Sequence, residues 1–322
     1  MNILITGAKG FVGTALTEAL INNGDKVTVL LRNHSKDLSR TIKQQYCNFE
    51  DITSLSSLNL SSINCVIHLA ARAHVMKDSA KDPLAEYRLI NTDGTLELAK
   101  LAGDVGVKRF IYLSSVKVNG ELTSPGKPFS ENDFTHLDDP YAISKYEAEI
   151  GLLDIAAKSD MEVVIIRPPL VYGPNVKGNF ASMISWVKKG IPLPFGLSHN
   201  NRSLIALENL VGFILLCADH DKSPNAANQV FLISDGEDVS TTLLLRKVAH
   251  AYDTKSFLFP IPTLFMRLTA KIIGKNDLAN RLLGNLQIDS SKARKLLGWK
   301  PIVSMDEQLI KMAEFDKRKN NL

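Results

Sequence analysis

The chain has 322 residues, 45% of them hydrophobic and 22% charged, and a net charge of +4. This composition excludes a disordered or fibrous protein, and the length suits one large domain or two unequal lobes. The 38 basic residues are scattered, which argues against nucleic-acid binding, and no apolar run reaches the about 18 residues of a membrane span.

Short hydrophobic runs alternate with helical stretches along the chain. The runs cover 2–6, 26–31, 64–70, 109–115 and 162–168. They are nearly continuous, which predicts strands buried on both faces of a parallel sheet. Helices are expected between them, notably over 82–102 and 139–158. We therefore predict an α/β fold of the Rossmann type, with a doubly wound parallel sheet and a smaller, mostly C-terminal substrate-binding lobe.

Three glycines follow the first expected strand at intervals of three residues. They are Gly7, Gly10 and Gly13 in TGAKGFVG. Gly7 permits a tight turn, Gly10 lets a pyrophosphate approach the backbone, and Gly13 lets the next helix pack close to the sheet. The start of that helix offers free N–H groups and the positive end of its dipole. This stretch predicts a dinucleotide-binding site.

A second stretch, DPYAISKYEAEIG, places Tyr141 and Lys145 one helical turn apart on the same face. Asp139 is expected to cap this helix, with Pro140 as its first residue. A phenol with a reference pKa near 10 is a poor base, so the ammonium and the helix dipole are expected to lower the pKa of Tyr141. The pair alone could be an exposed ring beside an exposed amine, but near a dinucleotide site it predicts proton transfer.

Further motifs occur in a fixed order along the chain. They are HLAAR (68–72), NTDGTLEL (91–98), YLSSVKVNG (112–120), RPPLVYGP (167–174) and DSSKARKLLGWKP (289–301). Together with Gly-x-x-Gly-x-x-Gly and Tyr-x-x-x-Lys, they make the whole chain resemble the extended short-chain dehydrogenase/reductase family of NAD-dependent epimerases and dehydratases. The nearest resemblance within it is to UDP-glucose 4-epimerase-like proteins and UDP-4-keto-hexose reductases.

The resemblance implies a role for each matching residue. Tyr141 would exchange a proton with the substrate oxygen, Lys145 would bond the nicotinamide ribose, and Ser115 would align the substrate; a plain strand-end hydroxyl suits Ser114 better. Asn179 and Arg202 would hold the diphosphate and nucleoside of a UDP-sugar. The expected cofactor-binding residues are Gly7, Gly10, Phe11, Val12, Gly13, Arg32, Asp51, Ile52, Leu69, Ala70, Ala71, Asn91, Lys145 and Pro168.

The end of the second expected strand bears on the choice of cofactor. An acid there usually bonds the adenosine ribose of NAD, but this strand ends with Leu31 and Arg32. A guanidinium suits a 2′-phosphate, so NADP(H) is favoured and NAD(H) is possible; Arg32 could also be a solvated strand end. Asp51 resembles the adenine-contacting aspartate of the family, or is only a turn residue.

The leading hypothesis is reduction of a UDP-4-keto-hexose, of the 2-acetamido-2,6-dideoxy type, for a surface polysaccharide precursor. The alternative is a UDP-hexose or UDP-N-acetylhexosamine 4-epimerase, and a third reading is a non-catalytic NADP-sensing protein. The family's dehydratases carry an Asp-Glu pair after the catalytic hydroxyl, where this chain has Val116 and Lys117, which argues against dehydration. Leu170 replaces an asparagine that contacts substrate in many relatives.

The resemblance also divides the chain. We expect a cofactor domain of residues 1–168 plus about 204–235, and a nucleotide-sugar lobe of about 169–203 plus 236–322. A homodimer is expected.

Other features bear on environment and on smaller roles. Three widely spaced cysteines, Cys47, Cys65 and Cys217, suggest a reduced cytoplasmic protein without a metal site. His74 is expected to be structural. The apolar segment 257–274 is expected to be a core-facing cap helix, with a dimer contact or a membrane surface as alternatives.

Overall fold

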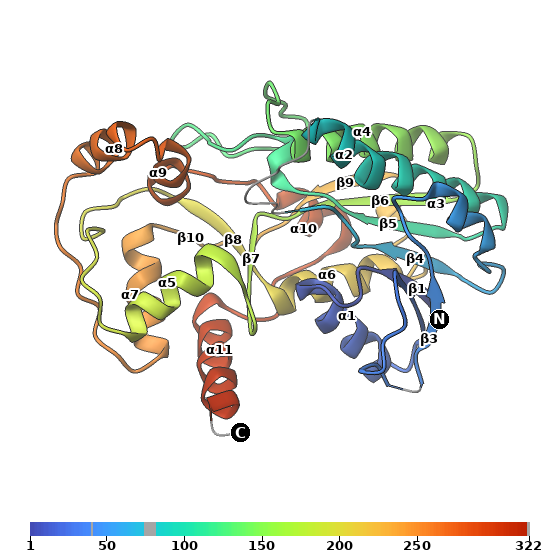
Figure 1. The fold of residues 1–322 in the computed structure, drawn as a ribbon, viewed down its shortest axis with the longest axis horizontal. Helices are drawn as coiled ribbons and strands as arrows, with labels where there is room; N and C mark the ends of the chain where they lie inside the picture. Colours follow the sequence, from blue (N-terminus) through green and yellow to red (C-terminus); the bar gives the residue numbers. More distant parts are fainter. Residues whose placement is uncertain (40, 74–81, 321–322) are drawn as a thin grey trace.

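A computed structural model describes residues 1–39, 41–73 and 82–320 of the chain. Its larger lobe is built on a seven-stranded sheet in which every neighbouring pair is parallel (Figure 1). From one edge to the other, the strands are β3 (Lys43–Tyr46), β2 (Lys26–Leu31), β1 (Asn2–Thr6), β4 (Cys65–His68), β5 (Arg109–Leu113), β6 (Glu162–Arg167) and β9 (Gln229–Leu232). This order is that of a doubly wound Rossmann sheet, which confirms the predicted fold class.

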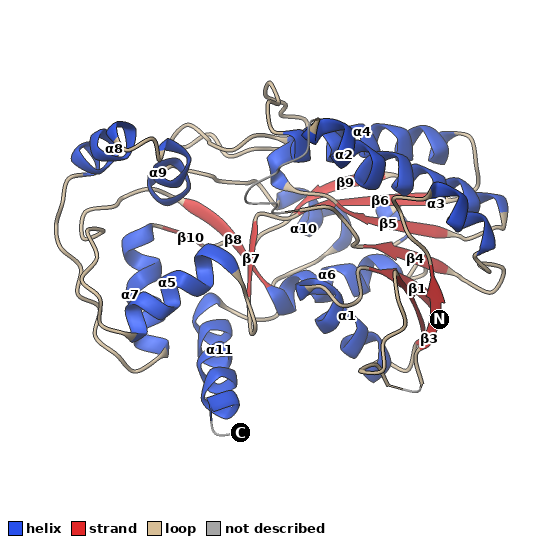
Figure 2. Ribbon diagram, viewed as in Figure 1, coloured by secondary structure: helices blue, strands red, loops and turns tan. Residues whose placement is uncertain are grey.

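The strands are hydrophobic throughout because helices cover both faces of the sheet (Figure 2). Ile3 and Ile5 face a core that includes α1 (Phe11–Asn22), α6 (Leu207–Ala218) and α10 (Ser291–Leu297). Leu4, between them, faces the opposite core, where α3 (Gly94–Asp104) and α4 (Pro140–Ala157) pack. Successive side chains of a strand point to opposite faces, so an interior strand buried on both has no polar alternation.

The expected helix over 82–102 is divided in the structure. It begins with α2 (Pro83–Arg88), whose N-cap is Asp82, and continues into α3 through a π-helical turn, η2 (Leu89–Asp93). A π-turn inside a helix frequently marks a functional position, and this one contains Asn91. Three short 3-10 helices complete the larger lobe: η1 (Ile52–Ser57), η3 (Val116–Val118) and η4 (Pro224–Ala226).

The smaller lobe has a second sheet of three strands, in the order β10 (Asp238–Val239), β8 (Arg202–Ala206) and β7 (Leu170–Tyr172). Its core joins Tyr172 of β7 to apolar residues of the surrounding helices. Those helices are α5 (Gly178–Lys188), α7 (Thr241–Ala251), α8 (Thr263–Ile272), α9 (Asn276–Leu283) and α11 (Met305–Asn320). The exact division of the chain between the two lobes stays a prediction.

The expectation that 257–274 forms a core-facing cap holds only for one face, on which Leu258, Met266 and Ala270 pack against the lobe core. No residue of α8 is buried, and its large apolar side chains lie mostly on the surface. The sequence misleads here because α8 is apolar on more than one face, and only one of them meets the lobe. Across the described residues, no helix is both long and apolar enough to cross a membrane.

Candidate active site

The predicted cofactor residues gather at one edge of the large sheet. Gly7 follows β1, Leu69 follows β4 and Pro168 follows β6, and the carboxyl ends of parallel strands lie at the same edge. Ser115 follows β5 at this edge as well. The sheet therefore brings together in space four segments that are far apart in the sequence.

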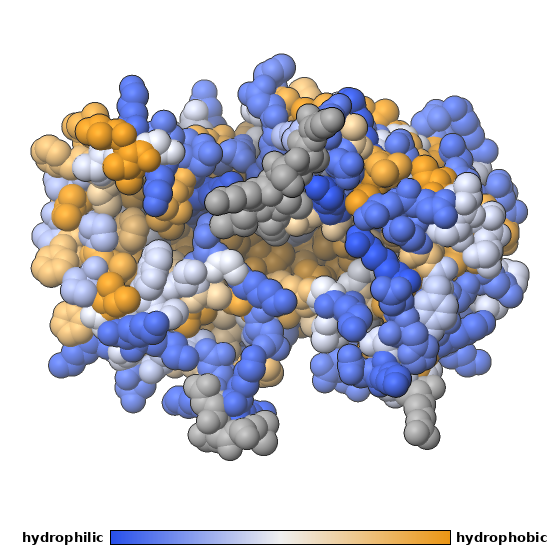
Figure 3. Space-filling view, in the orientation of Figure 1, coloured by the Kyte–Doolittle hydropathy of each residue, from blue (hydrophilic) through white to orange (hydrophobic). Residues whose placement is uncertain are grey.

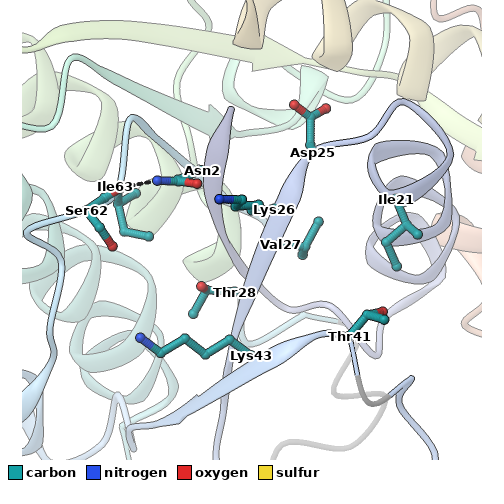
Figure 4. Close-up of a pocket in the computed structure, with 10 residues that line it drawn as sticks. All are labelled: Asn2, Ile21, Asp25, Lys26, Val27, Thr28, Thr41, Lys43, Ser62 and Ile63. Carbon is teal, nitrogen blue, oxygen red and sulfur yellow. Dashed lines mark hydrogen bonds between the residues drawn. The ribbon is translucent and has the colours of Figure 1, made fainter.

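A surface pocket of about 570 Å³ lies elsewhere, against the amino ends of β1 and β2 (Figure 4). It is lined by Asn2, Lys26 and Lys43 among others, and Asn2 Nδ2 donates to the carbonyl of Ser62 at 2.8 Å. Ligands of doubly wound sheets bind at the carboxyl ends of the strands. This pocket is therefore not part of the candidate site.

The glycine turn fits a pyrophosphate. Gly7 has φ +70°, and a Cβ there would lie 2.8 Å from the amide nitrogen of Ala70. A Cβ on Gly13 would lie 2.1 Å from the carbonyl oxygen of Gly7, so helix and turn touch. Gly10 is the exposed N-cap of α1, and no side chain caps that helix. The first amides of α1, including those of Phe11 and Val12, are therefore left for an anion, which is where a dinucleotide would bind.

Asn91 fixes the loop that follows β4. It is fully buried; its Oδ1 accepts from the amide of Arg72 at 2.8 Å, and its Nδ2 donates to the carbonyl of Arg72 at 3.1 Å and to Ser144 Oγ at 3.0 Å. Ser144 is the neighbour of Lys145 in α4, so Asn91 joins the β4 loop to this helix. Leu69, Ala70 and Ala71 of that loop are all partly exposed at the sheet edge.

Tyr141 and Lys145 lie in the first turns of α4 as predicted. The Asp139 side chain accepts a hydrogen bond from the amide of Tyr141 at 3.0 Å, and Pro140 is the first helical residue. Lys145 is 1% exposed, and its Nζ donates to the carbonyl of Leu113 at 2.9 Å. The alternative that Tyr141 and Lys145 are merely an exposed ring and an exposed amine is therefore wrong.

The expected lowering of the Tyr141 pKa is wrong for the protein by itself. Burial, followed by the charge of Asp139, raises the pKa of Tyr141 well above its usual value, and a hydrogen bond with Ser115 only partly opposes this. Burial also lowers the pKa of Lys145 to about 7, against the opposite effect of Glu149. The ammonium lies 4.4 Å from the centre of the Tyr112 ring, so its partners are on β5. Desolvation outweighs the attraction that the spacing suggested.

Ser115 is placed where the prediction needs it. Its hydroxyl interacts with Tyr141 and accepts a bond from the amide of Lys117 at 3.2 Å. Ser114 instead donates to the carboxylate of Glu149 beneath the site. Ser114 was predicted to be a plain strand-end hydroxyl. Its side chain instead belongs to a network of charged groups.

That network is one feature which the sequence did not reveal. Glu149 lies one turn beyond Lys145 in α4 and pairs with Arg167, the last residue of β6, at 2.5 Å. Both side chains are at most 7% exposed. Arg167 also donates to Asn119 Oδ1 at 3.2 Å and to the carbonyl of Glu131 at 3.1 Å. The pair therefore joins α4, the end of β6 and the loop after Ser115.

Val116 and Lys117 occupy the place of the dehydratase carboxyls. Val116 is buried, and Lys117 forms ion pairs with Glu121 at 3.0 Å and with Asp139, the N-cap of α4. Val116 cannot transfer a proton and Lys117 is held between two carboxylates, so the pair of carboxyls that would eliminate water is absent here.

Two predicted adenosine contacts lie at the outer part of the cofactor edge. Arg32 follows β2, is 63% exposed and lies 3.9 Å from the Glu50 carboxylate. Asp51 caps η1, because its Oδ1 accepts from the amide of Thr53 at 3.1 Å. Ile52, the first residue of η1, is partly exposed.

The predicted substrate residues are in the smaller lobe. Arg202 begins β8 and donates to the carbonyl of Gly284 at 3.1 Å, and burial, then the charge of Arg281, lowers its pKa. Asn179 is exposed in the first turn of α5, and Leu170 is 42% exposed at the start of β7. Arg281 was missed because a lone arginine in α9 has no motif. His74 lies outside the described residues.

Comparison with known proteins places this geometry in a family. Residues 3–233 match the model of the NAD dependent epimerase/dehydratase family. The chain belongs to this family. It is 46% identical over 321 residues to a UDP-glucose 4-epimerase of Vibrio cholerae, which covers 99% of this chain and 97% of the relative. An N-acetyl-alpha-D-glucosaminyl-diphospho-ditrans,octacis-undecaprenol 4-epimerase of Escherichia coli O157:H7 is 28% identical over 81% of this chain and 76% of its own.

The fold agrees with solved members of the epimerase/dehydratase family. The UDP-glucose 4-epimerase of Thermotoga maritima, solved with UDP-glucose, has a TM-score of 0.78 at 26% identity and covers 99% of this chain and 100% of its own. The family and the site together identify an NAD(P)-dependent enzyme of the extended short-chain dehydrogenase/reductase type. The resemblance seen in the sequence motifs is thereby confirmed.

Proposed function

We propose that the protein is a 4-epimerase of a UDP-hexose or UDP-N-acetylhexosamine. The observation that carries this proposal is the assembled set of Ser115, Tyr141 and Lys145 in a chain 46% identical to a protein named UDP-glucose 4-epimerase. The reductase hypothesis used the same three residues, and Arg32 was its only local support. The similar proteins are named as epimerases, so we prefer the epimerase hypothesis to the reductase hypothesis.

The residues present can move the proton that epimerisation requires. Tyr141 removes a proton from the C4 hydroxyl of the sugar and later returns it, while Ser115 holds the same oxygen. A nicotinamide cofactor held by the glycine turn and Lys145 would supply the reversible hydride acceptor that epimerisation at C4 requires. Tyr141 is protonated in the protein alone, which suits the second half of this cycle; the first half requires added positive charge near the phenol.

Arg202 and Arg281 support the diphosphate as the group that the smaller lobe holds. Burial, followed by the charge of Arg281, lowers the pKa of Arg202, so an anion bound beside Arg202 would relieve this repulsion. Arg202 is also partly buried beside Gly284, so its position is fixed before the ligand binds. The exposed Asn179 and Leu170 are proposed to select the sugar.

We propose NAD(H) as the resident cofactor, in place of the NADP(H) that Arg32 favoured. The carboxylate of Glu50 lies 3.9 Å from Arg32, and a 2′-phosphate bound by that guanidinium would be close to this negative charge. Neutral ribose hydroxyls do not meet that repulsion. The homodimer remains a prediction.

The test uses the purified protein with no cofactor added. UDP-glucose and UDP-N-acetylglucosamine are supplied separately, and the products are separated by anion-exchange chromatography. Formation of the C4 epimer without consumption of reduced cofactor supports the proposal. Inertness toward both sugars, with stoichiometric oxidation of added NADPH by a UDP-4-keto-hexose, would restore the reductase hypothesis instead.

A further inference from the structure

The end of the smaller lobe carries a concentration of exposed apolar side chains. Eight of the 24 exposed large hydrophobic residues in the described chain lie within 257–273. They form what we call the α8 surface, made of Phe257, Phe259, Ile261, Leu264, Phe265, Leu268, Ile272 and Ile273. Figure 3 shows hydrophobic residues gathered at this end, which lies far from the large sheet. Isolated exposed apolar residues need no explanation, but a contiguous set marks an interaction site.

The α8 surface is held in place by backbone contacts. The amide of Phe259 donates to the carbonyl of Leu193, and the amide of Leu193 donates to the carbonyl of Phe257, both at 2.8 Å. Leu258 packs inward against the lobe core, so Phe257 and Phe259 point outward on either side of it. These aromatic rings are therefore fixed on the surface of the folded lobe.

The helix itself has two apolar faces with different neighbours. Met266 and Ala270 pack against the core of the lobe. Leu264, Leu268 and Ile272 recur every four residues, share a stripe on the other side, and are 64%, 49% and 84% exposed. A helix that only capped the lobe would need the first face alone. The second face has nothing in the folded chain to cover it among the described residues.

Cations outnumber acids along this stripe, because the exposed Asp253 and Asp277 lie only at its two ends. Between residues 254 and 276 the charged residues are Lys255, Arg267, Lys271 and Lys275, and all four are exposed. None of them forms an ion pair within the described chain. Lys271, in the last turn of α8, borders the outward stripe, where its long side chain can reach beyond the apolar surface. Arg267 instead donates to the carbonyl of Leu283 at 3.0 Å.

We propose that the α8 surface rests on a membrane that contains anionic lipids. Fixed aromatic and aliphatic side chains would enter the boundary between headgroups and acyl chains, while Lys271 and Lys275 meet the lipid phosphates. An apolar stripe with cations beside it, and acids only at the ends of the segment, is complementary to such a surface. The smaller lobe, which holds the proposed substrate site, would then lie next to the lipid headgroups.

A second copy of the chain fits the same surface less well. A twofold contact places the same surface on both sides. Each partner would bring the same cations, and residues 254–276 offer no carboxylate to meet them. Like charges opposed across an apolar interface are costly, whereas lipid phosphates neutralise them.

The experiment is co-sedimentation of the full-length protein with lipid vesicles, which needs no substrate or activity. One set of vesicles contains phosphatidylcholine alone, and the other equal parts of phosphatidylcholine and phosphatidylglycerol. The protein should sediment with the mixed vesicles and be released at high salt. Equal binding to both sets, or binding to neither, would overturn the proposal.

Two double variants, each with a matched control, assign the binding to the α8 surface. Leu264→Ser with Leu268→Ser should abolish sedimentation, whereas Ile302→Ser with Ile310→Ser, equally exposed elsewhere, should not change it. Lys271→Gln with Lys275→Gln should weaken binding by about tenfold to thirtyfold, at about 1 kcal/mol for each cation, while Lys100→Gln with Lys108→Gln should leave it unchanged. Light scattering gives the oligomeric state of each variant. A dimer that Leu264→Ser with Leu268→Ser splits, without vesicle binding by the parent, would assign the surface to a second copy instead.

Discussion

The cofactor side and the substrate side of the candidate site are built differently. On the cofactor side, the contacts are backbone turns and buried groups, such as Gly13 against Gly7 and the fully buried Asn91. On the substrate side, Asn179 is exposed and Arg202 is only partly buried. A close-packed site fixes geometry, and an open one can change its ligand without altering the fold. We therefore expect changes on the first side to affect rate or folding, and changes on the second to affect substrate affinity.

The sharpest test on the cofactor side is Tyr141→Phe. It removes the group that transfers the proton and keeps the ring, so turnover should fall about 10²–10⁴-fold while cofactor affinity is retained. Tyr146→Phe, on the same helix and packed against Phe134, is the matched control and should keep normal turnover. Turnover by Tyr141→Phe close to that of the parent would remove the phenol from the mechanism. Initial rates and cofactor fluorescence measure both quantities.

Glu149→Gln tests whether the packed side depends on its buried charges. Arg167 would be left without its carboxylate in a site that excludes water, and breaking such a pair typically costs about 3–5 kcal/mol of stability. Glu147→Gln, two residues earlier, disrupts a pair with the exposed Arg88 and should leave the denaturation midpoint nearly unchanged. Urea denaturation of the two variants compares them directly. Equal midpoints would show that the network carries little of the stability.

Most of the cofactor side could be predicted from the sequence, because its determinants are local. The glycine spacing, the Asp139 cap and the Tyr141–Lys145 turn each depend on residues close together in the chain. The edge strand β3 was missed, because its KQQY residues are polar and at most partly buried. Burial of the phenol could not be predicted either, since it depends on packing between distant segments, and it reverses the expected direction of the Tyr141 pKa.

The substrate side was less predictable for the same reason. Arg281 approaches Arg202 from a helix 79 residues further along the chain, and no motif joins them. The α8 surface was read as a core cap because apolar residues on two faces of a helix look alike in sequence. Which face meets the lobe is decided by the strand and loop contacts of 257–259, which are tertiary.

On the substrate side, Arg202→Ala should raise KM for the UDP-sugar and leave kcat almost unchanged. A charge-assisted hydrogen bond contributes about 1.5–3 kcal/mol, which corresponds to about 10- to 150-fold in affinity. Arg246→Ala, an exposed arginine of α7 in the same lobe, is the control and should change neither constant. A fall in kcat with constant KM would mean that Arg202 acts in the reaction and not in substrate binding. That result would contradict the division between the cofactor side and the substrate side.

The smallest expected effect concerns Arg32, at the outer limit of the cofactor side. If the enzyme holds NAD(H), this exposed guanidinium is a solvated strand end beside Glu50, and Arg32→Ala should change the ratio of NADH to NADPH affinity by less than about threefold, or about 0.7 kcal/mol. Glu50→Gln then serves as the converse variant, because it removes the carboxylate that would repel a 2′-phosphate and should improve NADPH binding modestly. Fluorescence titration of both cofactors measures these ratios. A loss of NADPH affinity of about tenfold or more in Arg32→Ala would mean that the guanidinium grips a phosphate. The packed cofactor side would then select its ligand through an exposed residue, as the substrate side does, and reduction with NADPH would again be the better account of the enzyme.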